Sequence, residues 1–129
     1  MIIFCCSCGG DIEARLTNGA EIYPHRKDLE PLPFWRCDAC GNHVGCHHRT
    51  RARTKPLGCI PTPEIKAARS RIHGLLDPIW QSGRADRKTL YRLISVAIGR
   101  EYHTAEIRSV EEANEVFNVI KEIKREYFN

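Results

Sequence analysis

Long apolar segments are absent from this chain of 129 residues. No run approaches the roughly 20 apolar residues that a membrane-spanning helix requires, so the sequence predicts no membrane partner. The opening stretch, MIIFCCSCGG, also lacks the basic residues that precede the apolar part of an export signal. We therefore expect a protein without a signal peptide that resides in the cytoplasm.

A recognisable catalytic set is also missing. The six histidines are scattered along the chain, and the sequence places no partner beside any of them. No cluster of carboxylates offers the oxygen ligands that a magnesium-dependent nuclease would need. A metal-dependent enzyme would require a second metal here, so we predict that the protein is not an enzyme and keep that function as the last alternative.

Cysteine, in contrast, is abundant, with seven residues arranged mostly in close pairs. Two C-x-x-C-G motifs, Cys5–Gly9 and Cys37–Gly41, each let two thiolates reach one ion, and the closing glycine permits the positive φ of a tight turn. Free thiols, a disulfide and an iron–sulfur cluster are the alternatives. Two such pairs separated by a hairpin and a loop are typical of a zinc ribbon. The motifs predict one structural Zn²⁺, closed to catalysis, bound by Cys5, Cys8, Cys37 and Cys40.

Three cysteines remain outside this set. Cys46 adjoins His47 and His48, which leaves a second metal site there as an alternative. A mixed site, in which His43 or His47 replaces a thiolate, is another. Otherwise Cys46 and Cys59 are expected to be small buried side chains.

Acidic residues are scarce in the middle of the chain. Residues 39–100 carry twelve basic side chains and three acidic ones, although the net charge of the whole chain is only +4. A solvated loop tolerates such charge without any function. Basic side chains on a flexible segment beside a zinc ribbon are also a common means of holding phosphates. The candidate nucleic-acid contacts are Arg49, Arg51, Arg53, Lys55, Lys66 and Arg69.

Residues 1–46 predict short strands and tight turns, which form the zinc ribbon. The alternation of polar and apolar side chains over Asp11–Leu16 indicates a half-buried strand. The pair Asn18 and Gly19 favours a hairpin turn, with a return strand over residues 20–23.

A further strand is expected at Phe34–Arg36, before the second knuckle, and residues 43–45 continue after it. Phe34 and Trp35 are expected to cover the metal site rather than to stack on bases. Residues 47–61, HHRTRARTKPLGCIP, show no periodicity and contain four arginine or lysine side chains, no acidic residue and two prolines. We interpret them as a basic linker.

Residues 62–129 predict a three-helix region. The first helix begins with Thr62 as its N-cap, and Pro78 is expected to kink or end it near Asp77. Its buried stripe, at helical spacing, is predicted to consist of Ile65, Ala68, Ile72, Leu76 and Ile79.

The second and third helices carry their own end signals. The second runs from the N-cap Asp86 to Gly99, and the third begins at the capping box formed by Ser109 and Glu112. The exposed face of the third helix is acidic, which argues against its insertion into a major groove. The fold expected is α+β, with zinc-ribbon hairpins packed against three helices in one compact unit.

Several motifs, taken in order along the chain, carry a family resemblance. They are Cys5–Gly9, Gly19–Arg26, Phe34–His47, Lys55–Gly58, Arg69–Trp80 and Arg87–Ile98. With these stretches the chain resembles a phage and prophage family, the zinc-finger-containing domain of unknown function. The resemblance implies a mobile-element protein in a bacterial cytoplasm and zinc ligands at the four knuckle cysteines, but no activity.

Two functions therefore remain in view. The first is nucleic-acid binding in an accessory or regulatory role, with the basic linker contacting phosphates without reading sequence. The second is a protein-interaction module that binds and inhibits or redirects a host protein through an acidic surface of that partner. No small-molecule substrate is evident.

Overall fold

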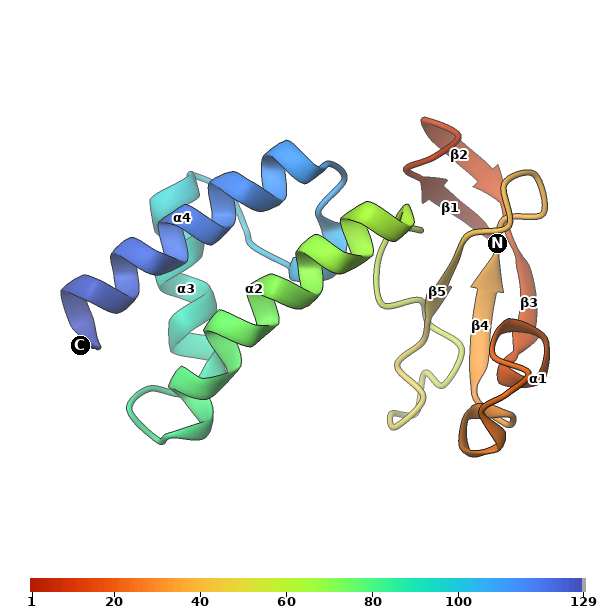
Figure 1. The fold of residues 1–129 in the computed structure, drawn as a ribbon, viewed down its shortest axis with the longest axis horizontal. Coiled ribbons are helices and arrows are strands. Elements are labelled where there is room, and N and C mark those ends of the chain that lie inside the picture. The colour runs from red at the N-terminus through yellow and green to blue at the C-terminus, as the bar shows by residue number, and fades with distance from the viewer. Residues whose placement is uncertain (129) are drawn as a thin grey trace. The chain divides into compact units, whose positions relative to one another are not determined.

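The computed structural model describes residues 1–128 and divides the chain into two compact units, Met1–Pro63 and Glu64–Asn129. The first, here called the N-terminal unit, contains antiparallel strands and the cysteine motifs, and the second, the helical unit, contains three long helices (Figure 1). The α+β class expected from the sequence is confirmed. The division falls after Pro63, next to the start at residue 62 that the sequence indicated for the helical region, so residues 47–61 lie in the N-terminal unit.

Two small antiparallel sheets build the N-terminal unit (Figure 1). The first pairs β1 (Ile2–Cys5) with β2 (Gly10–Glu13). The second has the order β3-β4-β5, from β3 (Arg15–Asn18), β4 (Pro33–Arg36) and β5 (His43–Gly45). The strands therefore bring each knuckle to the end of a hairpin.

The core of this unit is small and contains its cysteines. Trp35 and Val44 are neighbours across β4 and β5, and both are buried. Phe34 is also buried, so the two aromatic residues belong to the interior, and they do not offer rings for stacking on bases. The cluster consists of Ile3, Cys5, Ala14, Trp35, Cys37, Val44, Cys46 and Ile60.

The prediction of a hairpin turn at Asn18 and Gly19 is wrong. The Asn18 side chain instead caps a short helix, α1 (Gly19–Ile22), and accepts hydrogen bonds from the backbone N–H groups of Ala20 and Glu21 at 3.0 and 3.3 Å. Strand β3 therefore pairs with β4, and a 3-10 turn, η1 (Lys27–Leu29), lies between them. Asparagine is a good N-cap, and here that preference prevails over its preference for hairpins.

Residues 47–61 are folded onto the N-terminal unit. The Ile60 N–H donates to the Phe4 carbonyl at 2.8 Å, and the Cys6 N–H donates to the Ile60 carbonyl at 2.9 Å. Ile60 is fully buried. Preceding it, residues 47–55 form a loop, here called the basic loop, whose base is an antiparallel bridge between Cys46 and Pro56. The end of the segment expected as a linker is thus part of the core.

The helical unit contains α2 (Pro63–Gln81), α3 (Arg87–Ile98), a 3-10 turn η2 (Thr104–Glu106) and α4 (Val110–Tyr127). In Figure 1, α3 crosses behind α2 and α4. The stripe predicted for the first helix is buried in full. Fully buried side chains from all three helices form the core, namely Ile72, Leu76, Leu90, Ile94, Val116 and Ile120.

The ends of these helices follow the sequence signals, with one exception. Asp86 and Ser109 cap α3 and α4, and Gly99 ends α3 with φ of 76°. Pro78 does not end α2, which continues to Gln81. Proline removes one backbone donor, and only Ile79, Trp80 and Gln81 follow it in the helix. Within the described residues, no helix is both long and apolar enough to cross a membrane.

Candidate metal centre

Each knuckle is a tight turn at the end of a strand. Cys5 ends β1 and Cys37 follows β4, and their carbonyls accept from the N–H groups of Gly9 and Gly41 at 2.9 and 2.7 Å. Both glycines have positive φ, 77° and 81°. This conformation is strained for residues with a Cβ, so the glycine of each C-x-x-C-G motif closes its turn.

The two turns bring their four sulfurs together. The Sγ atoms of Cys5 and Cys40 are 3.5 Å apart, those of Cys8 and Cys37 are 3.7 Å apart, and all four lie within 4.8 Å of one another. Zinc–sulfur bonds of about 2.3 Å in a tetrahedron separate the sulfurs by about 3.8 Å. The cluster therefore has the dimensions of a four-thiolate zinc site.

Electrostatics favour a divalent cation at this position. Hydrogen bonds that the Cys8 thiol makes to the sulfurs of Cys37 and Cys5 favour its protonated form and raise its pKa to about 12. Burial acts to raise the pKa of Cys37, but hydrogen bonds from the backbone and thiol of Cys40 and the backbone of Ala39 lower it to about 7. Without a cation, one thiolate in the cluster therefore makes deprotonation of a second thiol unfavourable. A bound divalent cation compensates the negative charges and allows all four thiols to ionise.

A salt-bridge network supports the second knuckle. Arg15 on β3 donates through Nε and a terminal nitrogen to the two carboxylate oxygens of Asp38, each at 2.9 Å, and Arg36 also pairs with this carboxylate. The Arg15 guanidinium in particular lowers the pKa of Asp38 to about 2. This network cannot be predicted from the sequence, because nothing in the position of Arg15 along the chain indicates that β3 lies beside the second knuckle.

The donor set fits a structural zinc ion. Cys5 and Cys37 are buried, whereas Cys8 and Cys40 are exposed, so the cluster lies at the edge of the small core. Four thiolates fill the tetrahedral coordination of zinc and leave no open position for a substrate or a water molecule. Zinc bound by Cys5, Cys8, Cys37 and Cys40 would link the two hairpins.

The alternative metal arrangements are not assembled among residues 1–128. The four knuckle cysteines are the one group of three or more donors there that is close enough to share an ion. His48 Nδ1 contacts the Cys46 carbonyl at 3.3 Å and thus approaches backbone rather than a metal-binding group. His43 Nε2 contacts the Tyr23 hydroxyl at 3.0 Å. Cys46 and Cys59 are small buried side chains, which is the alternative to a second metal site that the sequence offered.

The candidate phosphate contacts fall into three environments. Arg49, Arg51, Arg53 and Lys55 are exposed on the basic loop, and Lys66 is exposed on α2 of the helical unit. Arg69 is different, because it is 9 % exposed and donates to the backbone carbonyl of Ile107. We correct its assignment, since a guanidinium buried inside the helical unit holds that unit together.

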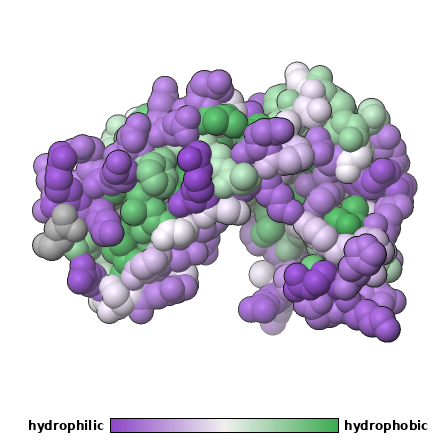
Figure 2. Space-filling model, viewed as in Figure 1, coloured by the Kyte–Doolittle hydropathy of each residue, from purple (hydrophilic) through white to green (hydrophobic). Residues whose placement is uncertain are grey.

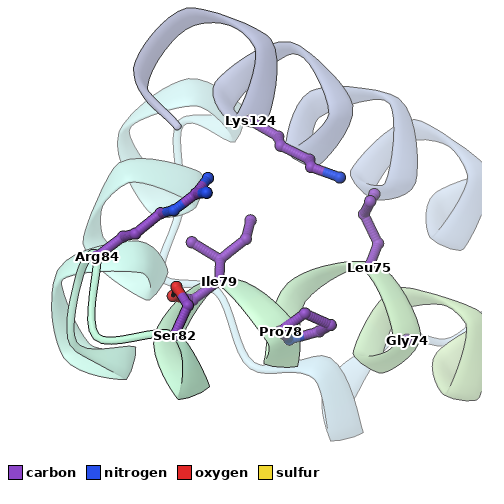
Figure 3. A pocket seen from close by; sticks show the side chains of 7 residues that line it. All are labelled: Gly74, Leu75, Pro78, Ile79, Ser82, Arg84 and Lys124. Carbon is purple, nitrogen blue, oxygen red and sulfur yellow. Dashed lines mark hydrogen bonds between the residues drawn. The ribbon is translucent and has the colours of Figure 1, made fainter. Parts of the chain in front are cut away.

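The helical unit has a shallow hollow of about 230 Å³ between α2 and α4 (Figure 3). Leu75 and Ile79 give it an apolar wall, and Lys124 and Arg84 stand at its edge, where Figure 2 shows apolar surface between the two helices. Its lining contains no histidine, cysteine or carboxylate. The hollow thus lacks the side chains that usually bind metal ions in proteins.

Comparison with known proteins agrees with the geometry of the knuckles. No curated protein and no solved structure matches the chain. A family described as a zinc-finger-containing domain matches residues 1–126, which include both knuckles, the basic loop and nearly all of the helical unit. By that match and by its four-cysteine cluster, the chain belongs to the zinc-finger-containing domain family.

Proposed function

We propose that this protein binds nucleic acid in an accessory or regulatory role, with the basic loop contacting the phosphate backbone. The charge of the loop carries the proposal. Arg49, Arg51 and Lys55 are exposed, and none of the ion pairs formed among residues 1–128 involves a residue of this loop. Uncompensated cations on one short segment attract a polyanion strongly.

Elsewhere in the N-terminal unit, several arginines form ion pairs with acidic side chains. Arg15 and Arg36 share the carboxylate of Asp38, and Arg26 pairs with Asp28 at 2.8 Å. Asp28 and Asp38 thus neutralise arginines on or near the strands, whereas the loop keeps its positive charge. In Figure 2 the surface over the loop is mostly hydrophilic.

The loop is ordered by its own hydrogen bonds. The His47 N–H donates to the Lys55 carbonyl at 2.9 Å, and the Thr50 hydroxyl donates to the His47 carbonyl at 2.8 Å. The Trp35 indole donates to the Thr54 carbonyl at 2.7 Å, which ties the loop to the core. An ordered loop loses less conformational entropy on binding than a flexible one.

Arg53 has a different role within the loop. Its guanidinium donates to the carbonyls of Pro31 and His48 at 3.0 and 3.3 Å, so it braces the loop against the segment before β4. Within the loop, Arg49, Arg51 and Lys55 remain as the proposed phosphate contacts, and Lys66 remains a candidate on the helical unit. Contacts of this kind fix position on the backbone and carry no sequence information.

A titration with labelled DNA and RNA at two salt concentrations tests the proposal. We expect binding that weakens as salt rises, with a slope of about 0.9 per phosphate neutralised on duplex DNA. Replacing Arg49, Arg51 and Lys55 by glutamine should lower affinity at low salt and reduce the slope by about 2–3.

The matched control replaces Lys27, Lys88 and Arg92 by glutamine, which removes the same charge from exposed positions elsewhere. We expect it to retain most of the affinity. Equal losses in the two triple variants, or no binding at low salt, would contradict the proposal. The second outcome would instead favour an acidic protein as the partner, which is the other class that the charge of the loop fits.

A further inference from the structure

Two cysteines outside the zinc site lie side by side. Cys6 is inside the first knuckle, and Cys59 lies 53 residues later, near the end of the N-terminal unit. Their Sγ atoms are 3.8 Å apart. The zinc site does not need either residue, because it is completed by the other cysteines of the two knuckles.

The backbone fixes this approach. Cys5 and Ile60 form a parallel bridge, and the hydrogen bonds that flank it join Cys6 to Ile60 and Ile60 to Phe4. A disulfide requires sulfurs about 2.05 Å apart. Because the two segments are already held together, rotation of the side chains can close the remaining gap between the sulfurs.

The two thiols differ in accessibility. Cys6 is half-buried at the surface of the knuckle, whereas Cys59 is 3 % exposed. A small oxidant in solution therefore reaches Cys6 first, and Cys59 is placed to attack the product from within.

We propose that Cys6 and Cys59 are a redox-active dithiol, which closes to a disulfide by exchange with a low-molecular-weight disulfide such as oxidised glutathione. In the first step the Cys6 sulfur attacks one glutathione sulfur, forms a mixed disulfide and releases one glutathione thiol. The Cys59 sulfur then attacks Cys6 and releases the second. The protein loses two electrons and two protons, and oxidised glutathione gains them as two thiols.

The bond would connect the first knuckle to the chain just after the basic loop. In the reduced protein, two backbone hydrogen bonds around Ile60 hold this junction. In the oxidised protein a covalent bond closes a long loop, which restricts the unfolded chain and stabilises the N-terminal unit. The pair thus makes the attachment of the segment that follows the loop sensitive to the thiol–disulfide balance.

Peptide mapping of the zinc-loaded full chain tests the proposal. The protein is incubated with oxidised glutathione, remaining thiols are alkylated, and disulfides are located by mass spectrometry without reduction. We expect a Cys6–Cys59 cross-link in a protein that keeps its zinc and melts at a higher temperature than the reduced form. Recovery of both cysteines as alkylated thiols, or cross-links among the knuckle ligands with loss of zinc, would overturn it.

Variants separate the two roles. Cys59→Ala should form no internal cross-link and should accumulate glutathione on Cys6, whereas Cys6→Ala should leave the buried Cys59 largely unmodified. Cys46→Ala removes another buried cysteine and should form the cross-link as the wild-type protein does. If the Cys59 variant does not fold, the map of the wild-type protein still decides, because it identifies the joined residues directly.

Discussion

Cys37 illustrates how single residues make the metal centre. Its carbonyl closes the turn with the Gly41 N–H at 2.7 Å, and the backbone of Cys40 and Ala39 points donors at its sulfur. Cys37 therefore begins the turn and is also a metal ligand, and the hydrogen bonds to its sulfur favour the thiolate over the thiol. The other three sulfurs lie within 4.8 Å, so each ligand depends on the ion that compensates its neighbours.

Replacing Cys37 by serine should abolish stoichiometric zinc binding. Structural zinc contributes on the order of 10–16 kcal/mol in small domains, far more than a core of this size can supply. The N-terminal unit should consequently lose its cooperative unfolding transition. Metal analysis and thermal unfolding measure the two effects.

The matched control is Cys46→Ser, because Cys46 is equally buried but lies outside the cluster. We expect this variant to be less stable and still to bind one zinc ion. If it loses zinc as the Cys37 variant does, the assignment of ligands is wrong.

Zinc affinity should rise with pH. In the metal-free protein the Cys8 thiol, with its pKa raised to about 12, keeps its proton, and Cys37 takes one up below about pH 7. The zinc-bound form holds neither proton, so acid favours the metal-free state. Competition with a chromophoric chelator should show affinity increasing as pH rises through neutrality, with the steepest dependence below about pH 7. An affinity independent of pH would contradict the four-thiolate site.

At the scale of elements, Gly19 explains the path between β3 and β4. A Cβ at this position would lie 1.8 Å from the backbone oxygen of Leu29. Helix α1 and turn η1 therefore approach each other at a point where only glycine fits. The Asn18 cap starts the helix, and Gly19 lets the chain fold back closely enough for β3 to reach β4.

Gly19→Ala should destabilise the N-terminal unit by at least about 1–3 kcal/mol, the usual cost of overpacking, because the clash is with backbone. Gly10→Ala is the control, since a Cβ there has no neighbour within 4 Å. It should change stability by less than about 1 kcal/mol. Chemical denaturation of both variants measures the difference, and similar losses would argue against the tight contact at Gly19.

The sequence predicted those elements whose signals are local. The C-x-x-C-G spacing identified the ligands, and Asp86, Gly99 and Ser109 marked helix ends that the structure retains. Asn18 was ambiguous, because asparagine serves both in hairpins and as an N-cap, and only the position of the later strand β4 decides between them.

Contacts between segments that are distant in the chain could not be predicted from the sequence. Ile60 follows a basic run and a proline, and this local sequence indicates a linker. In the structure, however, its side chain is fully buried beside β1. The position of Arg69 along α2 predicts a solvent-facing side chain. In the structure its guanidinium is buried and donates to the carbonyl of Ile107. Both outcomes depend on partners 38 or more residues away.

At the scale of the whole molecule, two units carry separate means of stabilisation. The N-terminal unit has short strands, a small core and the metal centre. The helical unit has its own buried core, which includes Leu76, Leu90 and Val116, and its described residues contribute no ligand to the cluster. Small cores of the first kind usually need a metal or a disulfide, and three packed helices do not.

Removal of zinc by a chelator should therefore act on one unit. Amide hydrogen exchange in residues 1–63 should accelerate strongly, while α2, α3 and α4 retain most of their protection. Hydrogen exchange with mass spectrometry resolves the two parts. Loss of protection throughout the chain would show that the helical unit depends on the metal as well.

Substitution of cobalt for zinc, followed by absorption spectroscopy, tests the central claim most directly. Co²⁺ reports both the geometry and the ligand type of its site, and Cys5, Cys8, Cys37 and Cys40 are expected to form a closed tetrahedron around it. We expect one cobalt ion per chain, with the bands of a tetrahedral four-thiolate site and no change when small anions are added. A spectrum with histidine or water ligands, or a second bound ion, would contradict it.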